Sequence, residues 1–332
     1  MISIFRSYHP GVIFLLLLYT AMFRVPILLA AVPFTPPESA NYLSSLTYQL
    51  LSWLIGDRNY IYHVAASVLV FFQALYFNYI INNHRILSRS SYLPAMSYVL
   101  VSSVLIEFTL LTPALIANTF LLFALSKVLS TYKKEKASPI LFDASLLVAM
   151  ASLFFFPYIA FFLFILAAMV VLRPFNMREY LISVIGLLLP YYFIGVYFFW
   201  YHNLDAFWKT IEITQLNFPL QQLERSVRVI VTGSTLLAVA LWTFFYVQGN
   251  IFRMVVQVRS YMMVFIFLFV AGVFSLLIQF TGEFYHFVWI AIPIGLAFAI
   301  FGMEIRRRWV AEIVHFFLLL SALFFQYYSL VK

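Results

Sequence analysis

Long, almost uninterrupted runs of apolar residues constrain this chain more than any other feature. Two of them read VIFLLLLYTAMF, over residues 12–23, and LFFFPYIAFFLFILAAMVV, over residues 153–171. Segments that are apolar on all sides over such lengths are typical of helices that cross a membrane. A transmembrane β-barrel is excluded, because its strands alternate apolar and polar residues.

The composition extends this interpretation to the whole chain. Of its 332 residues, 64% are hydrophobic and 10% are charged, whereas soluble proteins have about 45–50% apolar and about 25% charged residues. The chain has no cysteine, which excludes disulfides, thiolate metal sites and a thiol nucleophile. We predict an all-α protein, a polytopic transmembrane helical bundle that forms a single integral membrane domain over residues 1–332.

About eleven spans fit the sequence, because one span needs about 20 apolar residues and the breaks fall where Lys, Arg, Pro and Gly cluster. The segment 139–172 fits either two short spans or one re-entrant hairpin bent at Pro157. The predicted spans lie near residues 10–32, 60–82, 92–111, 113–131, 139–156, 157–172, 179–201, 228–248, 260–281, 284–303 and 309–329. The last four form a C-terminal part over residues 228–332.

Basic residues divide unequally between the two sides of this predicted bundle, with thirteen on one side and five on the other. Loops rich in Lys and Arg face the cytoplasm, so we expect a cytoplasmic N-terminus and a periplasmic C-terminus. Because this topology accounts for the net charge of +8, the charge does not indicate a nucleic-acid partner. The thirteen are Arg6, Arg85, Arg89, Lys133, Lys134, Lys136, Arg173, Arg178, Arg253, Arg259, Arg306, Arg307 and Arg308, and the five are Arg58, Lys209, Arg225, Arg228 and Lys332.

The first polar interruption, residues 32–60, is expected to face outward. Three prolines between residues 33 and 37 end the first span, and Glu38 follows directly. From residue 39 to residue 55, leucines recur every three or four positions, with Ser and Gln on the other side. This pattern predicts an amphipathic interfacial helix over residues 39–55. A structural loop that packs over the bundle is an equally open interpretation.

A second polar stretch, residues 202–227, forms the other predicted outer loop. It combines Lys209 and Arg225 with aromatic residues, and Arg228 follows at the start of the next span. Arginine suits the recognition of phosphate through paired N–H donors. The aromatic rings fit either a sugar face or the headgroup belt of a membrane.

Charged residues within predicted spans are candidates for function, because burying charge in a bilayer is costly. Arg24 and Glu107 have similar estimated depths near the outer side, which predicts an intramembrane ion pair or a substrate contact. Lys127 and Asp143 are expected to staple a helical hairpin. The six histidines are scattered, which argues against a metal site. No phosphate-binding glycine loop occurs, and no cofactor is expected.

The order of parts over residues 1–201 resembles the C-type, polyprenyl-phosphate-dependent glycosyltransferases. In that superfamily one span leads to an outer loop with an acidic catalytic residue and interfacial helices, a pattern matched here by the first span, Glu38, the predicted helix and Asp57. The resemblance implies catalytic roles for Glu38 and Asp57. Two features depart from the pattern: Asp57 lies far from Glu38, and no large soluble outer domain follows the last span.

The opening MISIFRSYHP and the phrase LRPFNMREYLISVIGLLLPYY resemble an uncharacterised family of polytopic bacterial inner-membrane proteins. Its members are sometimes labelled carotene monooxygenases. The sequence does not support that label, because such an enzyme resembles a soluble-type propeller with four iron-binding histidines. The resemblance implies a bacterial inner-membrane, cell-envelope location.

Two functions from different classes remain open at the level of the sequence. In the first, a glycosyltransferase-like enzyme moves a sugar from a polyprenyl-phosphate lipid to an acceptor at the outer face. Glu38 would then be the general base, Asp57 would orient it, and Lys209, Arg225 and Arg228 would bind the lipid phosphate. In the second, the chain is a non-catalytic subunit or scaffold of an envelope or secretion assembly, with other envelope membrane proteins as partners.

Overall fold

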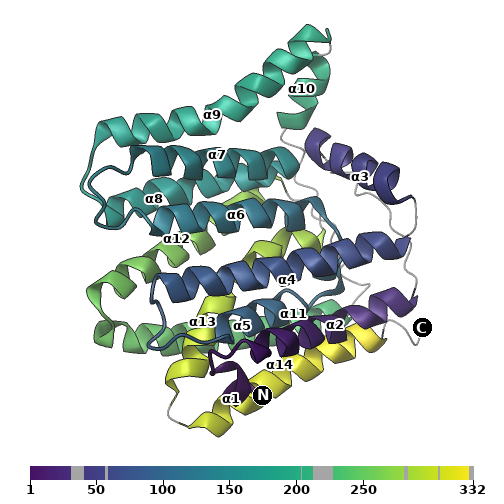
Figure 1. Cartoon of the computed structure of the whole chain (residues 1–332), viewed down its shortest axis with the longest axis vertical. Coiled ribbons are helices and arrows are strands. Elements are labelled where there is room, and N and C mark those ends of the chain that lie inside the picture. Colours follow the sequence, from purple (N-terminus) through teal and green to yellow (C-terminus); the bar gives the residue numbers. More distant parts are fainter. Residues whose placement is uncertain are drawn as a thin grey trace.

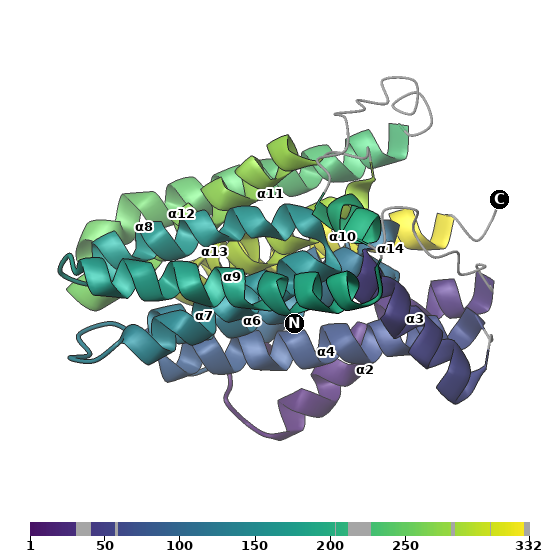
Figure 2. The same ribbon diagram turned by 90° about the horizontal axis from the view of Figure 1, so that it is seen from above.

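The computed structural model describes residues 1–30, 41–56, 59–202, 204–211, 227–279, 283–305 and 307–328. Within these ranges every regular element is a helix (Figure 1), which confirms the predicted all-α class. Most of the long helices run roughly alongside one another, and Figure 2 shows the same arrangement from above.

The N-terminal part of the fold is built from ten helices of the described residues, including two short 3₁₀ turns. Their bounds are α1 Ile2–Phe5, α2 Gly11–Ala30, α3 Tyr42–Ile55, α4 Asn59–Asn83, α5 Leu93–Val101, η1 Ile106–Thr109, α6 Pro113–Leu129, α7 Ser138–Phe154, η2 Phe156–Phe161 and α8 Phe162–Leu172.

The C-terminal part follows with longer helices. Their bounds are α9 Met177–Trp200, α10 Leu204–Ile211, α11 Val227–Asn250, η4 Ile251–Arg253, α12 Val256–Ile278, η5 Phe284–Ile290, α13 Ala291–Glu304 and α14 Arg308–Tyr328.

Five helical segments of the described residues are long and apolar enough to cross a membrane. Three shorter apolar helical segments, Pro113–Leu129, Ser138–Phe154 and Phe156–Leu172, lie between them in the chain. The five candidate spans are Gly11–Leu28, Tyr60–Asn83, Met177–Trp200, Val256–Ile278 and Phe284–Glu304. These helices are consistent with a membrane-embedded protein, and the further predicted spans remain predictions.

The predicted span over residues 92–111 is not one continuous helix. Helix α5 ends at Val101, and the 3₁₀ turn η1 begins only at Ile106. Ser102 closes the helix, because its hydroxyl donates to the carbonyl of Val99 at 3.2 Å, a local bond that competes with the helical pattern. Irregular backbone at membrane depth is tolerated where protein buries it, and Ser102 and Ser103 are fully buried. We call residues 102–112, between α5 and α6, the α5–α6 connection.

The stretch over residues 202–227 is not a loop throughout, because α10 occupies residues 204–211 and packs beside α9. The interfacial helix predicted over residues 39–55 corresponds to α3, which begins at Tyr42. Helix α3 lies against α7, and the side-chain amide of Asn41 donates to the carbonyl of Ser152 at 3.5 Å.

The connections rich in basic residues gather at one end of the bundle, on the left of Figure 1. They follow α4, α6, α8, α11 and α13 in the chain. We call this the basic end. The opposite end, on the right of Figure 1, carries α3, α10 and the C-terminal end of α2.

Close packing of α7 on α9 depends on a glycine. A Cβ atom added to Gly186 would lie 2.7 Å from the carbonyl oxygen of Phe142, much closer than an ordinary van der Waals contact. Small residues of this kind let helix backbones approach each other in membrane proteins. Helix α7 in turn packs against α6, so these three helices form one layer of the bundle.

Candidate functional site

The predicted catalytic pair, Glu38 and Asp57, lies outside the described residues, and so does Arg225. Lys209 belongs to α10 and Arg228 to the first turn of α11. Figure 2 places α10 and the beginning of α11 toward the same end as α3. The helices that carry two of the predicted phosphate-binding residues therefore share an end of the bundle with the predicted interfacial helix.

Arg24 of α2 is the most deeply buried arginine among the described residues, with 2% of its surface exposed. Its Nη1 donates to the carbonyl oxygen of Thr109, in η1. Its Nε and Nη2 are buried without a hydrogen-bond partner. A buried guanidinium that is only partly hydrogen-bonded is costly, so a second group with negative charge would stabilise it.

The predicted ion pair between Arg24 and Glu107 is not formed. The ion pairs of the described residues do not include either side chain, and Oε2 of Glu107 is buried without a hydrogen-bond partner. The similar depths predicted for Arg24 and Glu107 required one continuous helix over residues 92–111. Because that helix ends at Val101, Glu107 lies in a 3₁₀ turn, and Arg24 meets the backbone two residues further along.

Side chains of α2, α3 and α14 donate hydrogen bonds to carbonyl groups of the α5–α6 connection. Arg24 of α2 binds Thr109, the hydroxyl of Tyr48 in α3 donates to Leu111 at 3.3 Å, and Nε2 of Gln326 in α14 donates to Ser103 at 2.6 Å. All three donors are buried. The connection thus joins α2, the predicted interfacial helix α3 and α14 through polar contacts inside the bundle. We call Arg24, Glu107 and the α5–α6 connection the Arg24 centre.

A second buried polar network lies in the neighbouring helices α4, α5 and α6. The hydroxyl of Tyr98 in α5 donates to Oε1 of Gln73 at 2.7 Å and accepts from Nδ2 of Asn118 at 2.8 Å. Nε2 of Gln73 also donates to the hydroxyl of Thr119 at 2.8 Å. The network links α4, α5 and α6, and buried networks of this kind rigidify a core. Sequence reasoning missed it, although Gln73 and Asn118 stand out as polar positions in apolar helices.

Two ion pairs lie toward the basic end. The predicted staple between Lys127 and Asp143 is confirmed, with Nζ and Oδ2 2.7 Å apart. Both side chains are almost half exposed, so the pair adds little stability. The pair of Arg173 and Glu179 was not predicted, because Arg173 was assigned only a topological role.

The described residues contain no group of three or more His, Asp or Glu side chains that could hold a metal ion. Comparison with known proteins gives no match to any family model, curated protein or solved structure.

Proposed function

We propose that this chain is an integral membrane protein with an outward-facing, glycosyltransferase-like site that acts on a polyprenyl-phosphate-linked sugar. The observation that carries the proposal is the buried guanidinium of Arg24 in α2, with two nitrogen atoms free of hydrogen bonds. In the sequence, α2 is the helix that precedes Glu38. A phosphate of the lipid carrier supplies the negative charge that this group lacks, because arginine binds phosphate oxygens through paired N–H donors.

The remaining roles follow from the chemistry of glycosyl transfer. Glu38 acts as the general base that removes a proton from the acceptor, and Asp57 orients it. Lys209, Arg225 and Arg228 hold the carrier phosphate from the other outer segment. The sugar moves from the phosphate oxygen of the carrier to the deprotonated acceptor, and the carrier leaves as a lipid phosphate. No metal or cofactor enters this scheme.

The interfacial helix supports the outward site. Leu50 and Trp53 of α3 are 55% and 80% exposed, which leaves an apolar surface available to a membrane. The other face of α3 is anchored in the bundle by Tyr48, through the α5–α6 connection. A helix held in this way can present the end of a long lipid carrier to a group inside the bundle.

A second candidate function is a non-catalytic subunit of an envelope or secretion assembly. The surface of α9 favours it, because only 17% of this span is buried inside the chain. The second half of α9 carries exposed aromatic side chains, at Tyr192, Phe193, Phe199 and Trp200. Such a helix needs either lipid or a partner helix around it.

Two experiments distinguish the two functions. The first identifies the molecules that remain bound to the purified protein, and the second compares two variants of Arg24. In mild detergent, the enzyme retains a polyprenyl-phosphate lipid, detected by mass spectrometry of the extracted lipids, and a subunit retains a protein in stoichiometric amount. Arg24→Gln should lower the retained lipid phosphate about tenfold or more. Arg24→Lys, which keeps the charge, is the matched control and should retain part of it.

Glu38→Gln addresses catalysis independently of binding. Loss of a general base lowers a rate by about 10²–10⁴-fold, so this isosteric variant should keep its lipid and lose activity in cells. Full complementation of a deletion strain by Glu38→Gln would remove the catalytic role. Absence of any phosphate-bearing lipid from the wild-type protein would remove the proposed substrate class.

A further inference from the structure

A pocket of about 680 Å³ opens at the basic end, where four segments distant in the sequence meet. These are the turn after α4, the end of α11 with η4, the beginning of α12, and the junction of α13 with α14. Its volume falls within the range of small-molecule sites. We call it the basic-end pocket, and it lies at the other end of the bundle from the Arg24 centre.

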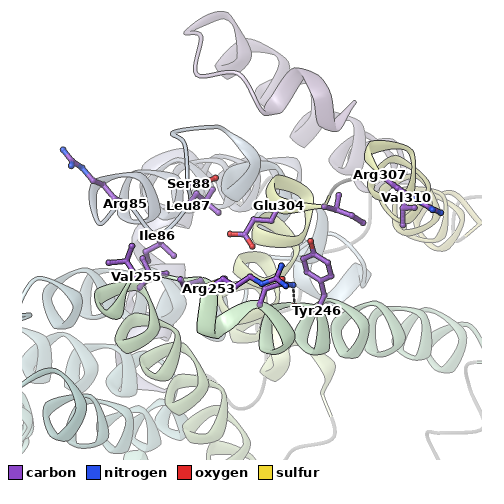
Figure 3. A pocket seen from close by; sticks show the side chains of 14 residues that line it. Arg85, Ile86, Leu87, Ser88, Tyr246, Arg253, Val255, Glu304, Arg307 and Val310 are labelled. Atoms are coloured by element: carbon purple, nitrogen blue, oxygen red, sulfur yellow. Dashed lines mark hydrogen bonds between the residues drawn. The ribbon is translucent and has the colours of Figure 1, made fainter.

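The pocket has both signs of charge on its walls. Arg85, Arg253 and Arg307 line it together with a single acidic residue, Glu304. Figure 3 shows the carboxylate of Glu304 directed into the pocket and the side chain of Arg253 extending across it toward Tyr246. Arg85 points away from the pocket, and Arg307 lies on the other side.

Glu304 is half-buried, and none of the ion pairs of the described residues includes it. The three arginines therefore do not neutralise its carboxylate by direct contact. A simple anion bound near Arg253 would place its charge close to this carboxylate, which is unfavourable. A ligand with both a phosphate and an ammonium group would satisfy both sides of the pocket.

The surroundings point to a lipid rather than a soluble ligand. Apolar side chains complete the lining, and among them Val255 is 71% exposed. Trp309, two residues from Arg307, is 59% exposed. Tryptophan concentrates at the headgroup level of membranes, next to arginine and lysine. The basic-end pocket thus has the chemistry of a site at the boundary between headgroups and acyl chains.

We propose that the basic-end pocket binds the headgroup of an amino-phospholipid, such as phosphatidylethanolamine. Arg253 binds the phosphate, with Arg85 and Arg307 adding positive charge at the rim, and Glu304 accepts hydrogen bonds from the primary ammonium. The apolar lining contacts the glycerol and the first carbons of the acyl chains. This site is independent of the proposed glycosyl-transfer function.

The test uses the full chain in mild detergent, titrated with short-chain lipids and followed by native mass spectrometry. Phosphatidylethanolamine should bind about tenfold more tightly than phosphatidylglycerol, the difference expected from one charge-assisted hydrogen bond. Inorganic phosphate, added as a separate probe, should compete only weakly. Equal or tighter binding of phosphatidylglycerol, or equal competition by phosphate, would overturn the assignment without need of any variant.

Two variants then show which side chains cause the preference for phosphatidylethanolamine. Glu304→Gln keeps the shape of the side chain and should abolish the preference while phosphatidylglycerol still binds, which also shows that the pocket is folded. Arg253→Gln should weaken both lipids about tenfold. Arg89→Gln, an exposed arginine of the same loop outside the lining, is the control and should change neither. A preference that survives Glu304→Gln contradicts the proposal.

Discussion

Arg173 and Glu179 form a two-pronged ion pair, in which Nε and Nη2 each lie 2.8 Å from a carboxylate oxygen. The two side chains are only 7% and 4% exposed. Arg173 also donates to the carbonyl of Thr131 at 3.2 Å, so one guanidinium ties the turn before α9 to the turn after α6. Arg173 thereby joins two connections of the basic end, while Glu179 holds its guanidinium in place.

Removing one partner of this pair should be strongly destabilising. Arg173→Ala leaves the carboxylate of Glu179 buried and unpaired, which costs about 3–5 kcal/mol. Arg173→Lys keeps the charge and loses the second prong, so its cost should be smaller. Denaturation in mild detergent measures both. The double variant Arg173→Ala/Glu179→Ala should be less destabilised than expected from the sum of the single variants, and simple additivity would contradict the pair.

Gly272 of α12 makes room for the ring of Trp289. An added Cβ would lie 2.4 Å from that ring, and the indole is almost fully buried, so it cannot swing aside. Gly272→Ala should therefore destabilise the protein by about 1–3 kcal/mol through overpacking. Gly249→Ala is the matched control, because no atom lies within 4 Å of a Cβ added there, and alanine favours a helix. Equal unfolding temperatures for the two variants would contradict this packing.

The helical class and most helix positions could be predicted, because they follow from long apolar runs and from proline. Helix α6 begins at Pro113, as expected for a residue that fits a first turn and breaks a helix interior. The break after Val101 could not be predicted in the same way. No proline or glycine marks it, and the hydroxyl of Ser102 can close the helix there because the surrounding protein buries the irregular backbone.

The candidate sites were predictable to different degrees. The burial of Arg24 follows from its place in an apolar helix, whereas its partner depends on where α5 ends. The basic-end pocket joins positions more than 200 residues apart, such as Arg85 and Glu304. Sequence reasoning assigned its arginines to topology alone. A carboxylate at the end of an apolar span, beside a run of arginines, is the sequence signal that could have indicated a more specific role.

Acidification should destabilise the protein through His84, in the turn after α4. Burial lowers the pKa of His84, and the nearby ammonium of Lys134 lowers it further. The unfolded chain then binds a proton, below about pH 6.5, that the folded protein does not. Stability is therefore lost as the pH falls through about 6.5, and the loss levels off below the folded pKa.

His84→Gln should flatten this part of the pH profile, and Lys134→Ala should reduce it by removing the neighbouring cation. Unfolding temperatures between about pH 7.5 and pH 5.5 provide the measurement, a range centred near the ordinary histidine pKa. A profile unchanged by His84→Gln would assign the effect to other groups.

The orientation of the bundle is the last prediction, and it depends on the unequal distribution of basic residues between the two ends. The chain has no cysteine, so single cysteines can be introduced as reporters. Each reporter position must be exposed for its thiol to react. Gln49 in α3 and Asp205 in α10 are exposed at the end opposite to the basic end, and Ser90 is exposed in the basic turn after α4.

In cells whose outer membrane is permeabilised and whose inner membrane is intact, Gln49→Cys and Asp205→Cys should react with a maleimide that cannot cross the inner membrane. Ser90→Cys should react only after the cells are lysed, because loops rich in lysine and arginine stay in the cytoplasm. The same Ser90→Cys protein, labelled after lysis, controls for accessibility of the thiol. Labelling of Ser90→Cys before lysis would reverse the orientation, and it would place the Arg24 centre on the cytoplasmic side, where a periplasmic glycosyl-transfer site is excluded.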